Sequence, residues 1–192
     1  MSQHQAQFDD LNAKELTFSI IGARYNSHLV DVLIKRATET LIEYGADREN
    51  IKVTRAPGSN ELPYLASMQG MTGEYDCIIA LGVVIAGDTE HHDIIAQSTA
   101  VSLHTASMNT FTPIINGIIT VNTEQQADDR VTGPLDRGAE FARAAIEMGT
   151  LSVSLVEEIE NVEAYEYLEE EGIFDEDDED DDDDMEQIFR KN

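Results

Sequence analysis

Short apolar runs and longer amphipathic stretches take turns along residues 16–152. The short runs have the length and composition of β-strands, whereas the longer stretches place apolar residues three and four positions apart, which is the period of a helix. The runs typical of strands are 16–22, 51–56, 76–85 and 112–121. The stretches typical of helices are 28–45, 60–71, 93–109, 123–130 and 138–151.

Individual residues at the ends of these elements strengthen the prediction. Gly45 suits the end of the first helix, because glycine adopts the left-handed conformation that follows many helices. Thr123 can cap the fourth helix with its hydroxyl. The run 76–85 is almost wholly apolar, so we expect a central strand that is buried on both faces. Asn116 and Gly117 are expected to interrupt the last strand.

The elements follow the order β-α-β-α-β-α-β-α-α, which predicts an α/β fold with a parallel sheet covered by helices on both faces. In open sheets of this kind, ligands bind at the carboxyl ends of the strands. The segments that follow the strands are 23–27, 57–61, 86–93 and 122–123. None of them carries a glycine fingerprint of the dinucleotide or nucleoside triphosphate type.

The chain is acidic, and its charge is concentrated at one end. The formal net charge is −27. Residues 1–155 contain 20 acidic and 10 basic side chains, whereas residues 156–192 contain 19 acidic and 2 basic ones. Binding to nucleic acid through phosphate neutralisation is therefore not expected. An anionic substrate would need a local positive site, built from the few arginines or from helix N-termini.

This compositional break predicts three parts: an N-terminal arm at 1–14, one domain at 15–155 and an acidic C-terminal tail at 156–192. Within the tail, residues 156–174 have helical spacing. Residues 175–184 are ten consecutive acidic residues, which should stay solvated and disordered. The tail is interpreted as a solubilising appendage, with a short docking peptide at 185–192 as the alternative.

Cysteine usage and hydropathy suit the cytoplasm. The one cysteine, Cys77, cannot form an intrachain disulfide, and its apolar neighbours favour a small buried side chain. The longest apolar run, 77–86, is far too short to span a bilayer, so no membrane partner is expected. Residues 1–10 lack the basic and apolar regions of a signal peptide.

The first two segments after strands carry an aromatic ring and a polar turn. Tyr25 can stack on a planar ligand or simply cover the edge of the sheet. Ser59 and Asn60 can cap the next helix, and Glu61 gains from its macrodipole. Together the turn residues also present N–H groups and a carboxylate to the strand ends, which suits a ligand rich in hydroxyls and amides.

The segment after the third strand combines a glycine turn with two histidines. Gly87, Asp88 and Thr89 can hold a phosphate through backbone N–H groups and a hydroxyl. His91 or His92 can transfer protons near neutral pH, although a histidine at a helix N-terminus is often purely structural. Neighbouring helical residues point about 100° apart, and no further histidine follows one turn later, so no metal site is expected.

Two arginines follow the last strand. Arg130 and Arg137 are plausible phosphate anchors in a chain this acidic, because a guanidinium binds phosphate oxygens in a bidentate manner. The alternative is a surface ion pair with a nearby carboxylate. The candidate partners are Asp128, Asp129 and Glu140.

Taken jointly, these segments resemble the lumazine synthase family over roughly residues 15–152. The matching motifs are RYN at 24–26, APGSNELP at 56–63, ALGVVIAGDTEHHD at 80–93, IITVNTEQQA at 118–127 and AAIEM at 144–148. Their order and separations make the resemblance specific. It implies a flavodoxin-like three-layer sandwich with a central four-stranded parallel sheet. It also implies pentamers with active sites between neighbouring subunits, and in some members a shell of twelve pentamers.

The family's reaction belongs to riboflavin biosynthesis and joins two small-molecule substrates. It condenses 5-amino-6-(D-ribitylamino)uracil with 3,4-dihydroxy-2-butanone 4-phosphate to give 6,7-dimethyl-8-ribityllumazine, phosphate and water. The resemblance implies that no metal and no organic cofactor is needed. Schiff-base formation, phosphate loss and ring closure need positioning and proton transfer more than a strong nucleophile.

The resemblance also assigns roles to residues. His91 matches the proton-transfer histidine, Tyr25 matches the aromatic that stacks on the pyrimidine, and Arg137 stands where the family has a lysine near the site. The other positions at the pyrimidine and its ribityl chain are Asn26, Ser59, Asn60, Glu61, Val83, Val84, Ile85 and Asn116. The other positions at the phosphate are Gly87, Asp88, Thr89 and Arg130.

Several positions depart from the family's pattern. Large aromatics or other apolar residues are replaced at Asn60, His92 and Asn116. A common arginine is replaced by Ala86, a frequent proline by Glu90, and the stretch 131–136 is one residue short and lacks a usual lysine. These changes reduce aromatic enclosure and positive charge, so substrate affinity and pyrimidine preference are expected to differ.

The departures and the acidic tail favour two alternatives to an active enzyme. One is a shell or scaffold protein with weakened catalysis, whose tail attracts cationic cargo by charge. The other is a module that binds a flavin or a lumazine without turnover. Product fluorescence separates an enzyme from both alternatives, and light scattering separates a pentamer from a larger shell.

Overall fold

Four strands and five α-helices make up the part of the chain that the computed structural model describes, residues 10–170, with side chains described to residue 162. The strands are β1 (Phe18–Ala23), β2 (Ile51–Ala56), β3 (Cys77–Ile85) and β4 (Ile114–Val121). The helices are α1 (Ser27–Glu43), α2 (Leu62–Gly70), α3 (His91–Thr110), α4 (Glu124–Val131) and α5 (Arg137–Glu170). Two 3-10 turns are η1 (Arg48–Asn50) and η2 (Ser59–Glu61).

The strands form one parallel sheet in the order β2-β1-β3-β4. Phe18 of β1 pairs with Ile51 on one side and with Cys77 on the other, and Ile78 of β3 pairs with Ile114. Because β3 lies inside the sheet, Cys77 to Val83 are buried, as the apolar run predicted. The expected three-layer α/β fold with a four-stranded parallel sheet is confirmed.

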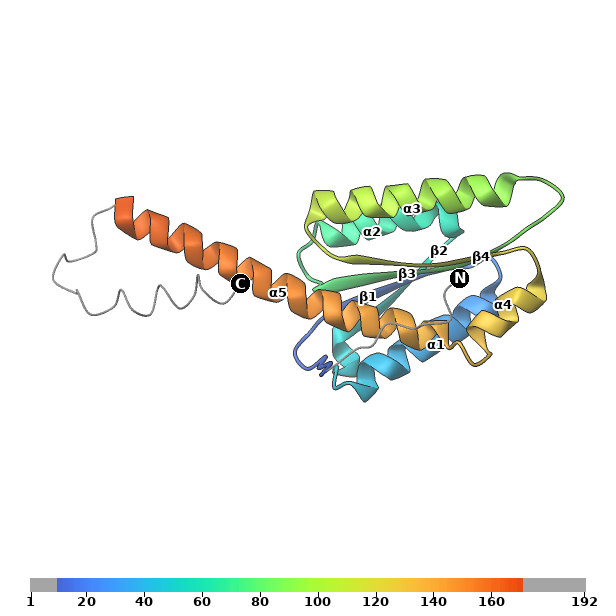
Figure 1. Ribbon diagram of the computed structural model, residues 1–192, viewed down its shortest axis with the longest axis horizontal. Coiled ribbons are helices and arrows are strands. Elements are labelled where there is room, and N and C mark those ends of the chain that lie inside the picture. The colour runs from blue at the N-terminus through green and yellow to red at the C-terminus, as the bar shows by residue number, and fades with distance from the viewer. Residues whose placement is uncertain (1–9, 171–192) are drawn as a thin grey trace. The chain divides into compact units, whose positions relative to one another are not determined.

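Helices cover both faces of this sheet. Figure 1 shows α2 and α3 on one face, and α1 and α4 on the other. The larger apolar core packs α1 and the first part of α5 against the sheet, with Phe18, Leu33 and Ile146 fully buried. The smaller core packs α2 and α3 on the other face, around Leu62 and Leu103. With both faces covered in this way, every β-to-α loop opens at the carboxyl edge of the sheet.

The structure corrects three details of the predicted elements. Asn116 and Gly117 do not interrupt β4, because both stay in register with β3. A Cβ at Gly117 would lie 2.6 Å from Leu81 Cδ2, so glycine here permits close packing rather than a turn. The segment after β2 begins with the 3-10 turn η2 before α2 starts. The helix α3 begins at His91, two residues earlier than its apolar spacing predicted.

Helix α5 runs through the position at which the sequence predicted two separate helices. Its residues belong to two compact units, 1–153 and 154–192. The sheet lies in the first unit, and the described part of the second, residues 154–170, is helical. The predicted acidic run at 175–184 and the peptide at 185–192 lie outside the described residues, as do residues 1–9. No helix within 10–170 is long and apolar enough to cross a membrane.

Candidate active site

A pocket of about 540 Å³ opens at the carboxyl edge of the sheet, a size suited to a small-molecule ligand. Its walls come from the loop after β1, the turn after β2, the end of β3 and the first two turns of α3. The lining residues are Tyr25, Asn26, Gly58, Ser59, Asn60, Glu61, Val83, Val84, Ile85, His91, Ile94, Ile95 and Ser98. Nine of the residues predicted to bind or convert substrate are therefore brought together by the fold.

Asn26 ties the loop after β1 to the end of β3. It adopts a left-handed conformation with φ of 52°, which asparagine tolerates, and it is the N-cap of α1. Its side-chain Nδ2 donates to the carbonyl oxygen of Val83 at 2.9 Å. The adjacent Tyr25 keeps 75% of its surface exposed, beside the backbone of Gly58. The ring is therefore open to stack on a planar ligand.

The turn after β2 places a hydroxyl at the floor of the pocket. Ser59 is buried, and a Cβ added to Gly82 would lie 2.5 Å from Ser59 Oγ. Gly82 thus makes room for this hydroxyl against the central strand. The prediction that Ser59 or Asn60 caps the next helix is wrong, because no side-chain capping bond starts either η2 or α2. Ser59 faces the strand end instead.

The end of β3 offers backbone polar groups to the pocket. On the β1 side, pairing stops at Leu81, whereas β3 continues to Ile85 and stays paired with β4. Val83, Val84 and Ile85 therefore present their backbone along the pocket wall. The Asn26 bond to Val83 takes up one carbonyl of this edge. Such an edge can read a heterocycle that carries donors and acceptors in the way that a neighbouring strand would.

Helix α3 supplies the imidazole and an apolar wall. His91, the first residue of α3, lines the pocket, and Ile94, Ile95 and Ser98 follow it on the same helical face. These last three residues, together with Gly58, were not predicted as site residues. Counting three, four and seven positions on from His91 would have found the three helical ones. Thr99, Leu103 and Ala106 of the same helix are buried in the core instead.

The predicted phosphate turn lies beside the pocket rather than in its lining. Gly87, Asp88 and Thr89 connect Ile85 to the N-terminus of α3 and are largely solvent-exposed. The Thr89 carbonyl lies 3.1 Å from His92 Nδ1, so an Nδ1–H would donate to it. His92 is thus engaged with the turn itself and is not among the lining residues. The turn leaves its backbone accessible to an anion at a helix N-terminus.

Three predicted residues lie away from this pocket within the same chain. Asn116 is on β4 and accepts from the Ile118 N–H through Oδ1. Arg130 lies in the last turn of α4 and donates to the Gln126 carbonyl at 2.7 Å. Arg137 begins α5 and pairs with Glu140 at 2.5 Å. The surface ion pair weighed for Arg137 is therefore present.

No Lys or Arg is among the described residues that line the pocket. Glu61 and His91 are the ionisable groups, apart from Tyr25, among the described residues that line the pocket. No group of three or more His, Cys, Asp or Glu side chains within the described range could hold a metal ion. The arrangement offers a stacking surface, hydroxyl and backbone partners, and an imidazole for proton transfer. These features define an α/β protein with a pocket suited to a planar, polar small molecule.

Comparison with known proteins narrows this class. The sequence profile for 6,7-dimethyl-8-ribityllumazine synthase matches residues 15–152, and the chain belongs to that family. The protein of that name from Nitrosospira multiformis is 36% identical over 148 residues, which cover 77% of this chain and 91% of the relative. Those from Polynucleobacter necessarius and Chlorobium phaeobacteroides are 34% and 36% identical. They match 79% and 73% of this chain and cover 86% and 92% of their own length.

Proposed function

We propose that the chain is an enzyme of riboflavin biosynthesis that makes 6,7-dimethyl-8-ribityllumazine from 5-amino-6-(D-ribitylamino)uracil and 3,4-dihydroxy-2-butanone 4-phosphate. Phosphate and water are the other products. The observation that carries the proposal is that one pocket collects Tyr25, the 59–61 turn, the end of β3 and His91. A stacking ring, hydroxyl partners, a backbone edge and a proton carrier are what this reaction needs, and the family supports it.

In this proposal the pyrimidine stacks on Tyr25 while the backbone of Val83 to Ile85 reads its edge. The ribityl hydroxyls meet Ser59, Asn60 and Glu61, which line the same pocket. The phosphate of the second substrate sits at the turn 87–89, above the N-terminus of α3. No metal or organic cofactor takes part.

His91 then moves protons between the reacting atoms. The amine of the pyrimidine adds to the ketone, and loss of water from the adduct gives an imine. Removal of a proton from the neighbouring carbon allows the phosphate to leave with the electron pair of its C–O bond. Phosphate loss leaves an enol, which takes up a proton at its terminal carbon and becomes a methyl ketone. Attack of the second nitrogen on this new carbonyl closes the ring with loss of a second water. Positioning lowers the barrier at each stage, and an imidazole at the pocket wall supplies general acid–base catalysis.

We further propose that Asn116, Arg130 and Arg137 complete the pocket of a neighbouring subunit. A phosphate dianion at the turn 87–89 needs cationic partners, and the described lining of the pocket contains no Lys or Arg. Arg130 and Arg137 lie on α4 and α5, outside the pocket lining of their own chain. A head-to-tail ring brings one surface of a subunit against a different surface of the next, so a pentamer, alone or within a 60-subunit shell, can join the two halves.

The activity test is direct. The wild-type protein mixed with both substrates should form the fluorescent lumazine product, whereas His91→Ala should form it much more slowly. Absence of product from the wild type would reject the proposed reaction. Tight riboflavin binding without product would favour a flavin-binding module instead.

The shared site is tested by mixing two inactive variants. Subunits with His91→Ala and subunits with Arg130→Ala are co-expressed and purified as mixed oligomers. If each site takes His91 from one chain and Arg130 from the next, random mixing restores about a quarter of wild-type activity. If both residues serve a pocket within one chain, the mixture stays as inactive as its parents. Light scattering on the same samples gives the number of subunits.

A further inference from the structure

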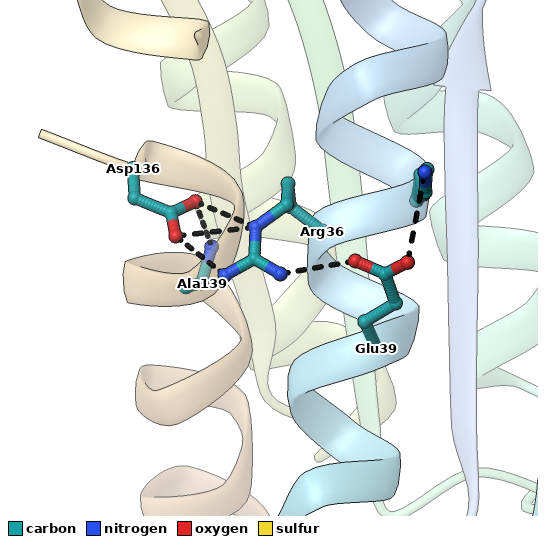
Figure 2. Close-up of polar contacts among 5 residues, drawn as sticks. Arg36, Glu39, Asp136 and Ala139 are labelled. Atoms are coloured by element: carbon teal, nitrogen blue, oxygen red, sulfur yellow. Dashed lines mark hydrogen bonds and ion pairs between the residues drawn. The ribbon is translucent and has the colours of Figure 1, made fainter. Parts of the chain in front are cut away.

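A charged clamp joins the middle of α1 to the start of α5. Figure 2 shows the Arg36 guanidinium between two carboxylates, Asp136 and Glu39. Its NH2 donates to Asp136 Oδ2 at 2.6 Å, and its Nε lies 3.3 and 3.2 Å from the two Asp136 oxygens. Its NH1 donates to Glu39 Oε2 at 3.0 Å. The geometry with Asp136 is bidentate, which is the strongest arrangement of this pair.

The Asp136 side chain also sets where α5 begins. Its backbone has φ of 39°, in the left-handed region that few residues other than glycine adopt. Its Oδ1 accepts from the Ala139 N–H at 3.4 Å, and its carbonyl accepts from the Glu140 N–H at 3.1 Å. The residue therefore caps the helix while it is held in an uncommon conformation. The two bonds from Arg36 offset the cost of that conformation.

Close packing beside the clamp leaves little freedom for the first turn of α5. A Cβ on Gly138 would lie 2.7 Å from Arg36 Cβ and 3.0 Å from the Leu33 carbonyl oxygen. The first turn of α5 thus rests directly on the backbone of α1. Arg36 is half-buried in this contact, and its donors are engaged by Asp136 and Glu39 rather than directed at a ligand.

The clamp lies next to an arginine that the proposed reaction uses. Arg137 follows Asp136 directly, so the conformation of Asp136 sets the direction in which the Arg137 side chain leaves the backbone. Arg137 pairs with Glu140 inside the first turn of α5, which the clamp holds against α1. Arg130 lies outside this turn, within α4, where it donates to the Gln126 carbonyl. The turn 132–136 separates the two arginines.

We propose that Arg36 is a positioning residue that acts through Asp136 to orient Arg137 toward the substrate phosphate. This inference rests on the proposed function, because it assigns Arg137 to that phosphate. In this proposal the clamp strengthens binding of the phosphate-bearing substrate. It does not affect binding of the pyrimidine, at the other end of the pocket. Arg36 touches neither substrate.

The test uses the full-length protein and two conservative changes. Asp136→Asn keeps the capping oxygen and tolerates positive φ, but it removes the charge that pairs with Arg36. Arg36→Met keeps the length of the stem and removes the guanidinium. Both variants should raise KM for the phosphate substrate about tenfold, with kcat and KM for the pyrimidine within about twofold. Glu39→Gln is the matched control, because it alters the other contact of Arg36 and should leave all three constants unchanged.

A double substitution separates the positioning of Arg137 from a general weakening of substrate binding. In an Arg137→Ala background, Asp136→Asn should raise the phosphate KM no further, because the group that it orients is gone. Additive effects in the double variant would overturn the proposal. So would an equal rise in both KM values, or an unchanged phosphate KM in Asp136→Asn.

Calorimetric binding of inorganic phosphate keeps this test independent of turnover. The proposal expects the wild type to bind phosphate about tenfold more tightly than Asp136→Asn. Equal phosphate affinity in the two proteins would overturn it. If the wild type binds phosphate with this difference but makes no lumazine, the proposed reaction fails and the clamp's role at a phosphate site stands.

Discussion

His91 concentrates the proposed chemistry of the pocket in one side chain. Its imidazole lines the pocket at the first residue of α3, where it can exchange protons near neutral pH. Replacing it with alanine should lower kcat about 100-fold, since general acid–base catalysis typically contributes that much, while both KM values change little. Stopped-flow fluorescence of product formation measures this directly. His104→Ala, an exposed change on the same helix, should leave kcat unaltered, and an equal loss in both variants would contradict the assignment.

Gly82 is the second residue on which the site depends. Alanine at this position would place a Cβ 2.5 Å from Ser59 Oγ, so the hydroxyl must move. Gly82→Ala should lower the free energy of unfolding by about 1–3 kcal/mol, as overpacking of a core does, and weaken pyrimidine binding. Denaturant titration and KM measure the two effects.

A second substitution separates these effects. Ser59→Ala removes the atom that Gly82→Ala displaces, so the double variant should regain stability without regaining pyrimidine affinity. If affinity returned along with stability, Ser59 would not contact the substrate.

At the scale of helices and strands, the sequence predicted most of the fold because each signal was local. Apolar spacing alone places β2 at its observed bounds, and Gly45, with φ of 102°, ends α1 as expected. Thr123 caps α4 by accepting from the Gln126 N–H. The errors arose where a residue far away in the sequence determines the local structure. Gly117 was predicted to interrupt the strand. Glycine is needed there because Leu81 and Phe141 pack closely against it, and this contact is visible only in the structure.

The candidate site could be predicted from the sequence only in part. Parallel topology alone points to the strand-end segments, and these supply most of the pocket. The wall formed by Ile94, Ile95 and Ser98 was missed, because two isoleucines on a helix are as typical of a core as of a ligand wall. Arg130 and Arg137 were expected at the site from family resemblance, and a single chain places them outside its own pocket.

The contact between α1 and α5 makes the molecule sensitive to acid. The hydrogen bonds from Arg36 hold the pKa of Asp136 below its ordinary value of 3.8, with Ala139 N–H and Arg143 acting in the same direction and burial opposing them. A carboxylate with a lowered pKa stabilises the folded state above its ordinary pKa, and this stabilisation is lost as the pH falls through the lowered value.

Asp136→Asn removes that titration. Chemical denaturation between about pH 5 and pH 2, a range that brackets the ordinary aspartate pKa of 3.8, should show a shallower loss of stability for the variant than for the wild type. Parallel curves would show that Asp136 does not contribute to the acid response. Glu39→Gln, which leaves the Asp136 pair in place, is the comparison for charge removed nearby.

At the scale of the whole molecule, the family match and the acidic tail are separate parts of the sequence. The match ends at residue 152, and the pocket lining and both arginines precede that point. Deleting residues 171–192 should therefore leave kcat and both KM values unchanged. The deletion also removes much of the negative charge, so ion-exchange elution should shift strongly even where kinetics do not. A loss of activity on deletion would show that the tail takes part in catalysis or assembly.

Cys77 is a natural probe for unfolding of the sheet. The sequence contains one cysteine, fully buried on the central strand β3, and burial raises the pKa of its thiol. Thiolate is the form that reacts with alkylating and disulfide reagents. The labelling rate of the native protein therefore measures how often the sheet itself comes apart, free of any contribution from surface thiols. One mass shift per chain records each event, in the isolated subunit and in any assembly alike.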